Sequence, residues 1–190
     1  WWTVDQLCQD TLLLIHKLPP DIDAICGIGR SGIIPASILA TILHLPLYCF
    51  SEEDGMRPAG HGVRMRKSST SPERVLLIDD SVASGRAIRF AAKALPKGVL
   101  RAAIYCPPEK TSLLDFHARI VPVPHYFAWN FFNSAHFIGQ CGFDFDGVIS
   151  LNPDSEIPEE YVSHCRDAGP LNLPRRGSVP LICSARLERS

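Results

Sequence analysis

The chain has 190 residues, 46% of them hydrophobic and 21% charged, which is typical of one globular domain or of one domain with an additional fragment. Its formal net charge is −1, and no basic run is interleaved with aromatic residues, so the sequence argues against a nucleic-acid or membrane-surface partner. The longest apolar runs fall well short of the roughly 18 residues that a membrane-spanning helix needs.

The cysteines and the start of the chain indicate a compartment. The seven cysteines form no C-x-x-C pair, and several lie inside apolar, strand-like runs, where cysteine behaves as a small hydrophobic residue. The N-terminal residues lack the basic segment followed by an apolar one that a secretory signal requires. We therefore expect reduced thiols and a cytoplasmic protein.

The first predicted element is a helix. Thr3 and Gln6 have the spacing of a capping box, and the apolar positions that follow extend the helix to about Lys17. Pro19 and Pro20 then end it.

Strands and helices alternate along most of the remaining chain. This alternation predicts an α/β fold, an open parallel sheet with flanking helices. Residues 51–72 are polar and lack periodicity, so we expect a mobile, functional loop there. The predicted strands are residues 23–28, 47–50, 75–78, 100–105 and 119–123, and the predicted helices are residues 33–43 and 86–95.

Two carboxylates, Asp79 and Asp80, follow the buried strand at residues 75–78 directly, and a loop of small residues comes next. Ligands bind beyond the carboxyl ends of parallel strands, and the N–H groups that open a helix bind phosphate. Gly85 would let the chain approach such a ligand closely. Carboxylates beside an anion-binding loop fit a ligand that carries phosphate and a diol, with Mg²⁺ nearby. The simpler alternative, an Asp that caps the helix, needs one carboxylate and not two.

Residues 75–87 resemble the thirteen-residue signature of type I phosphoribosyltransferases. A second stretch, residues 26–36, resembles the pyrophosphate loop of the same family and precedes the acidic pair by about 50 residues. By itself this glycine-containing turn is a weak signal, and it is one residue shorter than the dinucleotide-binding fingerprint. Together the two stretches extend the resemblance over roughly residues 20–130.

The resemblance implies a role for each loop. Asp79 and Asp80 would face the ribose hydroxyls of phosphoribosyl pyrophosphate (PRPP), directly or through Mg²⁺-bound water, and would be catalytic. Arg30 would neutralise the departing pyrophosphate, which Ser31 and Gly32 would help to bind. The ribose 5-phosphate would lie on the loop formed by Val82, Ala83, Ser84, Gly85, Arg86 and Ala87.

Other segments would complete the site by the same resemblance. The basic cluster of Arg64, Arg66 and Lys67 matches the family's mobile flap, although a solvated basic loop would have the same composition. Trp129 and Phe131 would stack on the acceptor base, although each aromatic residue is equally compatible with a place in the core.

The sequence departs from the family pattern at two positions of the phosphate loop. Enzymes for 6-oxopurines carry a further Asp where this chain has Ala83, so a 6-oxopurine acceptor becomes less favoured. The family often has Thr where this chain has Ala87, and the loss of that hydroxyl weakens the phosphate cradle. Neither departure affects the acidic pair.

The C-terminal part carries a separate signal. Residues 142–149 resemble the first motif of haloacid-dehalogenase-like (HAD) phosphohydrolases, in which Asp144 would be the nucleophile, Asp146 the general acid/base, and both would flank Mg²⁺. Residues 181–186 resemble the second motif, with Ser184 binding phosphate. The simpler alternative is a solvent-facing alternation on an edge strand. We expect residues 141–145 and 179–183 to pair as parallel strands. Because the later motifs do not follow, the segment would be a cut-off domain or a remnant without hydrolase activity.

These observations predict a phosphoribosyltransferase-like domain at residues 1–138 and a partial second α/β unit, HAD-like, at residues 139–190. The predicted activity is Mg²⁺-dependent transfer of a phosphoribosyl group from PRPP to a nitrogenous base, with release of pyrophosphate. Two alternatives stay open: a non-catalytic regulatory module that binds PRPP or nucleotides, and a HAD-type phosphohydrolase. A homodimer is a further expectation, because dimers are common in the family.

Overall fold

The structure, a computed structural model, describes residues 1–60, 72–95, 98–131, 134, 142–144 and 181–183. The chain divides into two compact units, Trp1–Phe127 and Ala128–Ser190. No helix within the described ranges has the length and apolar character that crossing a membrane requires.

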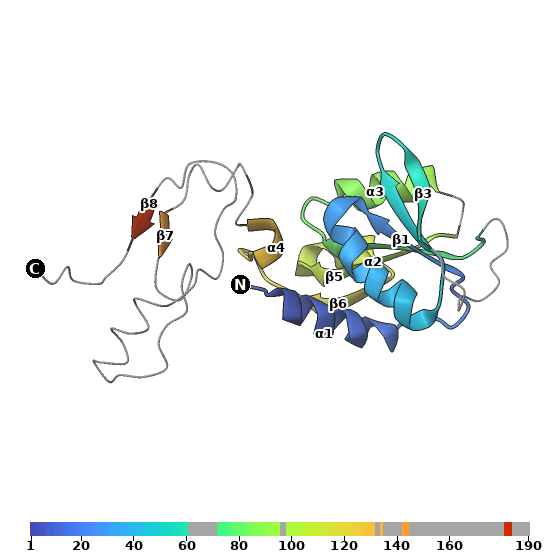
Figure 1. Cartoon of the computed structure of the whole chain (residues 1–190), viewed down its shortest axis with the longest axis horizontal. Helices are drawn as coiled ribbons and strands as arrows, with labels where there is room; N and C mark the ends of the chain where they lie inside the picture. Colours follow the sequence, from blue (N-terminus) through green and yellow to red (C-terminus); the bar gives the residue numbers. More distant parts are fainter. Residues whose placement is uncertain (61–71, 96–97, 132–133, 135–141, 145–180, 184–190) are drawn as a thin grey trace, which may run out of the picture. The chain divides into compact units, whose positions relative to one another are not determined.

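A six-stranded sheet forms the centre of the first unit (Figure 1). Neighbouring strands run parallel except at one edge, where the outermost pair is antiparallel. The predicted α/β fold with an open, mainly parallel sheet is confirmed. Across the sheet, the strands are β3 (Gly55–Gly60), β2 (Leu47–Ser51), β1 (Ala24–Ile28), β4 (Val75–Ser81), β5 (Leu100–Cys106) and β6 (Phe116–Ile120).

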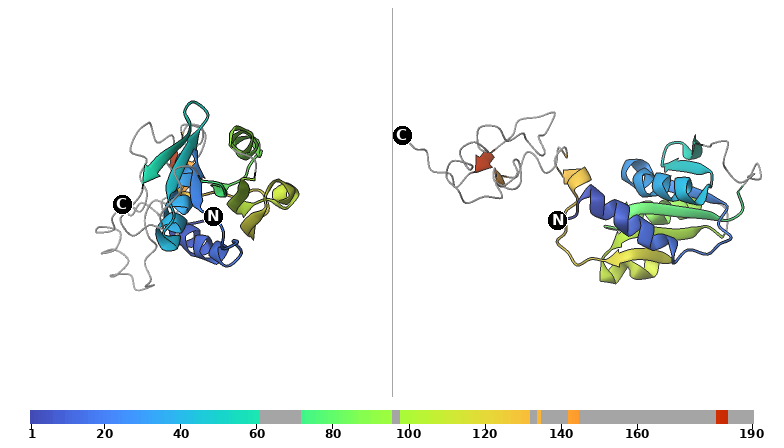
Figure 2. Two further views of the ribbon diagram at one scale, coloured as in Figure 1. Left: turned by 90° about the vertical axis from the view of Figure 1, so that its right-hand side faces the viewer. Right: turned by 60° about the horizontal axis from the view of Figure 1, so that its bottom comes forward.

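Helices cover both faces of this sheet (Figure 2). α1 (Val4–Ile15) and α2 (Gly29–Leu43) pack together on one face, and α3 (Arg86–Ala94) lies on the other. A short 3₁₀ helix, η1 (Pro108–Leu113), connects β5 to β6. Both helices predicted within the α/β pattern are present, but α2 begins at Gly29 and not at residue 33. Gly29 has a φ of 56°, which lets the chain turn from strand into helix without an intervening loop.

Residues 51–72 were predicted to form one long loop, and this prediction is wrong for part of them. Residues 55–60 form the edge strand β3 instead, paired with β2 in an antiparallel hairpin. Hydrogen bonding to β2 supplies the order that the polar sequence does not indicate. Pro58 is tolerated because an edge strand has one side without a partner. The predicted flap residues Arg64, Arg66 and Lys67 lie outside the described residues.

The last predicted strand of the sheet was displaced by a few residues. We expected residues 119–123, whereas β6 covers Phe116–Ile120. Asp115 accounts for the earlier start, because its carboxylate accepts a hydrogen bond from the backbone N–H of Arg101 at 2.7 Å and forms an ion pair with that guanidinium at 3.1 Å. These bonds hold the beginning of β6 beside β5.

The N-terminal helix α1 is held at its start by the capping box and, just beyond its end, by the side chain of Lys17. The predicted capping box is confirmed, since the Thr3 N–H donates to Gln6 Oε1 at 2.8 Å and the Gln6 N–H donates to Thr3 Oγ1 at 3.3 Å. Beyond the helix, Lys17 Nζ donates to the backbone carbonyls of His117 at 2.9 Å and Ala118 at 3.2 Å. The side chain of Lys17 therefore lies along the β6 edge.

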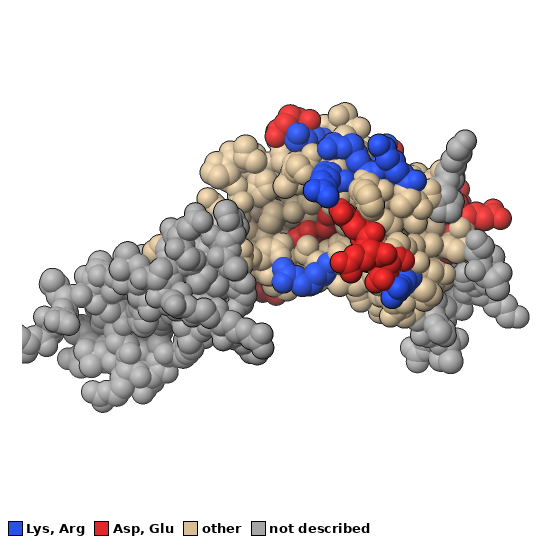
Figure 3. Space-filling view, turned by 90° about the horizontal axis from the view of Figure 1, so that it is seen from above, with Lys and Arg blue, Asp and Glu red and all other residues tan. Residues whose placement is uncertain are grey.

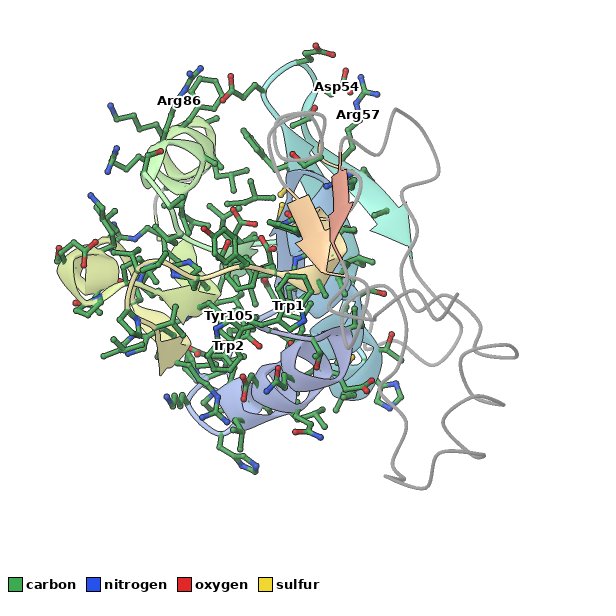
Figure 4. The ribbon with its side chains drawn as sticks, turned by 90° about the vertical axis from the view of Figure 1, so that its left-hand side faces the viewer. Trp1, Trp2, Asp54, Arg57, Arg86 and Tyr105 are labelled. Carbon is green, nitrogen blue, oxygen red and sulfur yellow. The ribbon has the colours of Figure 1, made fainter. Side chains whose placement is uncertain are left out.

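An ion pair between the buried Asp10 and the exposed Arg119 joins α1 to the sheet. Arg119 Nε lies 2.6 Å from Asp10 Oδ1, and Asp10 is 1% exposed. Trp2 packs against the buried Tyr105 with ring centroids 4.7 Å apart (Figure 4). Burial, together with the nearby Asp10 carboxylate, raises the pKa of Tyr105. Breaking the Asp10–Arg119 ion pair would leave the buried Asp10 carboxylate without a compensating charge, so this pair holds α1 and β6 together.

The second unit contributes three described elements, α4 (Ala128–Phe131), β7 (Gly142–Asp144) and β8 (Leu181–Cys183). The predicted parallel pairing of residues 141–145 with 179–183 is confirmed, because β7 and β8 form a parallel pair in which Asp144 lies opposite Cys183. Asp146 and Ser184 lie outside the described residues.

α2 packs closely against β1 at Gly27. A Cβ at Gly27 would lie 2.8 Å from the carbonyl oxygen of Gly32, 2.8 Å from Ile33 Cα and 2.9 Å from Ala36 Cβ. Two of these three neighbours are backbone atoms, which cannot move aside as the end of a side chain can. A glycine at position 27 therefore sets the distance between helix and strand.

We predict that Gly27→Ala destabilises the protein by about 1–3 kcal/mol, the usual cost of overpacking a well-packed interior. Urea unfolding followed by circular dichroism measures it. Gly60→Ala is the matched control, because a Cβ at Gly60 meets nothing within 4 Å. Equal stability of the two variants would contradict the close-contact argument.

Candidate functional site

The two sequence stretches that predict a site lie at the same edge of the sheet. β1 leads into α2, β4 leads into the loop before α3, and β1 and β4 are parallel neighbours. A Cβ at Gly32 would lie 2.8 Å from the Ile78 carbonyl oxygen and 3.0 Å from Asp79 Oδ1. The start of α2 therefore adjoins the acidic pair directly. Arg30, Ser31 and Gly32 all belong to the first turn of α2.

The acidic pair ends β4 and is mostly removed from water. Asp80 is 3% exposed, Asp79 keeps some solvent contact, and the Asp80 N–H donates to Asp79 Oδ1 at 2.9 Å. Burial raises the pKa of Asp79 to about 9, and the Asp80 carboxylate adds to the effect. At neutral pH the protein alone therefore holds a proton on Asp79, and one of the two carboxyls gives up its charge.

The loop after the acidic pair is built by a left-handed glycine. Gly85 has a φ of 77° and immediately precedes α3. A Cβ at this position would collide with Leu113 of η1 and would lie 2.9 Å from Arg89 Nη1. The Arg86 N–H donates to Ser84 Oγ at 3.3 Å. These features place the first amides of α3 at a tight turn, where helix N–H groups have no intrahelical partner.

The side chains of the two arginines of α3, Arg86 and Arg89, point in different directions from this loop. Arg86 extends to Glu52 in the turn between β2 and β3, with 3.4 Å between Nη2 and Oε2. Arg89 turns back, and its Nη2 donates to the Ser84 carbonyl at 3.2 Å. On the surface of the first unit, acidic side chains gather in and beside a hollow, with basic side chains around it (Figure 3). Acidic and basic side chains therefore lie close together on this face of the first unit.

Several predicted residues belong to other parts of the chain. Trp129 and Phe131, proposed to stack on a base, lie in α4 of the second unit, so their role stays a prediction. Asp144 ends β7 in the same unit. Within the described residues, no cluster of three or more His, Cys, Asp or Glu side chains could hold a metal ion.

Three residues of this region were not predicted from the sequence: Glu52, Arg89 and Leu113. Leu113 is 28 positions after Gly85 in the sequence, and no local pattern connects the two. Arg89 had a signal, because positions four residues apart lie on the same face of a helix and Arg89 follows Gly85 by four.

Comparison with known proteins gives two groups of relatives. The chain is 31% identical over 116 residues to the xanthine-guanine phosphoribosyltransferase of Desulfotalea psychrophila, an alignment that covers 58% of this chain and 72% of that protein. It is 31% identical over 84 residues to the orotate phosphoribosyltransferase of Levilactobacillus brevis, covering 44% and 39% of the two chains. No family model matches the chain.

A solved structure has the same fold. The xanthine-guanine-hypoxanthine phosphoribosyltransferase of Helicobacter pylori superposes with a TM-score of 0.50 at 14% identity, covering 67% of this chain and 89% of that one.

We predict that Asp79→Asn stabilises the protein and that the gain grows with pH. Between the ordinary carboxyl pKa of 3.8 and about 9, native Asp79 keeps a proton that the unfolded chain has lost, so wild-type stability falls as the pH rises through this range. Asn avoids that loss and still accepts the Asp80 N–H. We expect a gain of roughly 1 kcal/mol or more at pH 8, a few degrees in Tm, and little difference at pH 4.

Asp115→Asn is the control of opposite sign. Although burial alone raises the pKa of Asp115, its bonds to Arg101 outweigh burial and lower it, so removing that carboxylate should reduce stability at neutral pH. Thermal melts of the wild type and both variants at pH 4, 6 and 8 test the two signs. If Asp79→Asn melted below the wild type at pH 8, the argument from the buried pair would be wrong.

Proposed function

Because the chain belongs to the phosphoribosyltransferase family, we propose that it transfers the phosphoribosyl group of PRPP to a nitrogenous base at the β1–β4 edge of the sheet, with Mg²⁺ as cofactor. The observation that carries this proposal is the contact between the two loops. The first turn of α2 lies against Asp79, and the turn at Gly85 comes four residues after β4 ends at Ser81. The substrate carries a pyrophosphate and a 5-phosphate, and each of these two loops offers it one anion site.

The acidic pair suits a hydrated magnesium ion. Mg²⁺ binds oxygen ligands, keeps several waters, and is held by one or two carboxylates together with substrate phosphates. Asp79 and Asp80 supply two carboxylates, and no described lysine or arginine forms an ion pair with Asp79. Bound there, the ion would neutralise phosphate charge and orient the ribose hydroxyls.

Each side chain then has a distinct task. Asp80 and deprotonated Asp79 would hold the ribose diol, directly or through water on the ion. Arg30, in the first turn of α2, would offset the negative charge that develops on pyrophosphate as the bond from C1 of the ribose breaks. The amides that open α3 would bind the 5-phosphate, and Gly85 allows the backbone to come close.

The raised pKa of Asp79 connects substrate binding to proton release. Asp79 holds a proton in the protein alone, because burial and Asp80 raise its pKa to about 9. A divalent cation at the pair favours the ionised form. Binding of PRPP with Mg²⁺ would therefore favour release of the Asp79 proton to solvent at neutral pH.

The acceptor base is a purine or a pyrimidine. One relative is named for the purines xanthine and guanine, and the other for the pyrimidine orotate, so the two names support a purine and a pyrimidine acceptor respectively. Ala83 lacks the carboxylate of 6-oxopurine enzymes, which favours orotate or another base that needs no such group. Ala83 is exposed at the loop, where a side chain could approach a ligand.

The second unit supports a separate proposal, that residues 139–190 are a partial HAD-like phosphate-handling segment distinct from the transferase domain at residues 1–138. The parallel β7–β8 pair, which puts Asp144 beside the strand that precedes Ser184, favours it. Neither the relatives nor the solved structure described above is a phosphohydrolase.

We predict that the protein releases pyrophosphate from PRPP only when Mg²⁺ and a suitable base are both present. A coupled pyrophosphate assay with orotate, uracil, adenine, guanine and xanthine measures this. Asp80→Asn should lower kcat/KM by at least about 100-fold, since it removes a carboxylate from the ribose and metal site. Binding of PRPP without release of pyrophosphate for any base would support the regulatory alternative.

We also predict that the 190-residue chain hydrolyses no phosphomonoester, because no lysine follows Ser184 to balance the phosphate charge. The measurement is release of p-nitrophenol from p-nitrophenyl phosphate with Mg²⁺, in the wild type and in Asp144→Asn. Hydrolysis that disappears in Asp144→Asn and persists in Asp80→Asn would establish the phosphohydrolase alternative instead.

A further inference from the structure

Arg89 brings a guanidinium group to the loop that precedes α3. The residue lies one helical turn after Gly85, and its side chain bends back toward the start of the helix. Its Nη2 donates to the Ser84 carbonyl at 3.2 Å, and its Nη1 lies 2.9 Å from the position that a Gly85 Cβ would occupy. The charge of Arg89 is therefore placed against the turn itself.

Arg89 differs in its surroundings from the arginines that pair with carboxylates. Arg57, Arg74, Arg86, Arg101 and Arg119 each form such an ion pair, at distances between 2.6 and 3.4 Å. Arg89 is exposed, and among the described residues its one polar partner is a carbonyl oxygen. That bond uses one of the five N–H donors of a guanidinium and leaves its full positive charge without a carboxylate.

The loop needs an additional donor. Ala87 has no hydroxyl to offer a phosphate oxygen, and the other polar groups of the loop are backbone amides, Ser84 and Arg86, whose guanidinium is paired with Glu52. A guanidinium donates two parallel hydrogen bonds to a phosphate, and such charge-assisted bonds are about twice as strong as neutral ones. The positive end of the α3 dipole adds to the same field.

We propose that Arg89 binds the 5-phosphate of the phosphoribosyl substrate together with the amides that open α3, and so takes over the part that a hydroxyl at position 87 would have. This inference rests on the proposed function, because it assumes that the loop receives a phosphate monoester. Arg89 is a binding residue for the remote phosphate and does not touch the bond that breaks. Its removal should therefore weaken substrate binding and leave the chemical step intact.

A purely structural role for Arg89 is the rival explanation. In that case the bond to the Ser84 carbonyl would fix the loop, and its loss would lower Tm without a selective effect on phosphate. The two explanations predict different salt dependence of ribose 5-phosphate binding. If the Arg89 charge contacts the phosphate, part of the loss of affinity at high ionic strength comes from Arg89; if Arg89 only fixes the loop, none of it does.

Calorimetric titration with two probes tests the proposal. Ribose 5-phosphate carries only the remote phosphate, and inorganic pyrophosphate reports on the α2 loop; both are titrated in the presence of Mg²⁺ at two salt concentrations. The variants are Arg89→Met, which removes the charge, and Arg89→Lys, which keeps the charge and loses the fork. Lys93→Met is the matched control, since Lys93 is exposed one turn farther along α3.

We expect Arg89→Met to weaken ribose 5-phosphate binding at least about 10-fold, Arg89→Lys to have a smaller effect, and Lys93→Met to stay within about twofold. Pyrophosphate affinity should stay within about twofold in all three variants. KM for PRPP should rise in Arg89→Met while kcat changes little. The salt dependence of ribose 5-phosphate binding should be weaker in Arg89→Met than in the wild type.

Two results would overturn the assignment in different ways. If the wild type binds ribose 5-phosphate and both Arg89 variants bind it equally well with unchanged salt dependence, the loop binds phosphate without Arg89. If the wild type binds neither probe and releases no pyrophosphate from PRPP, the proposed function fails and the role of Arg89 with it. A Tm loss in Arg89→Met with full ribose 5-phosphate affinity in Arg89→Lys and Arg89→Met would establish the structural explanation.

Discussion

The close approach of α2 to the two central strands is the constraint on which the site depends. Gly27 lets the helix rest on β1, and Gly32 lets its first turn reach the end of β4, at distances that leave no room for a Cβ. A methyl group at either position would push α2 outward, and the loop that it begins would separate from Asp79. The same two glycines therefore set both the packing of α2 on β1 and the position of its first turn beside Asp79. At Gly32 this close approach outweighs the low helix propensity of glycine.

The acidic pair at the end of β4 destabilises the folded protein electrostatically. Asp80 is almost fully buried, and its neighbour Asp79 holds a proton at neutral pH because burial and a second carboxylate raise its pKa. Such an arrangement lowers stability in the protein alone and favours a cation that can bind both carboxylates. Under the proposed function, the stability lost at β4 keeps this edge ready to bind Mg²⁺ and a ribose.

The structural features that the sequence predicted correctly are those that a few adjacent residues determine. The capping box of α1, the strand that ends on Asp79 and Asp80, and the glycine turn before α3 are each encoded within a few adjacent residues. β3 was missed because its order comes from pairing with β2, and the start of β6 depends on a bond between Asp115 and Arg101. Leu113 beneath Gly85 belongs to the same class, since only the folded chain brings the two together.

The position of Lys17 bears on intermolecular β-sheet association. A strand at the edge of a sheet presents backbone acceptors to which a second chain can add, and β6 is such an edge. The ammonium of Lys17 already binds the carbonyls of His117 and Ala118 there. An incoming strand would have to displace a charged group and bury it without a partner, so the sheet resists intermolecular strand addition, and with it fibril-like aggregation, on this side.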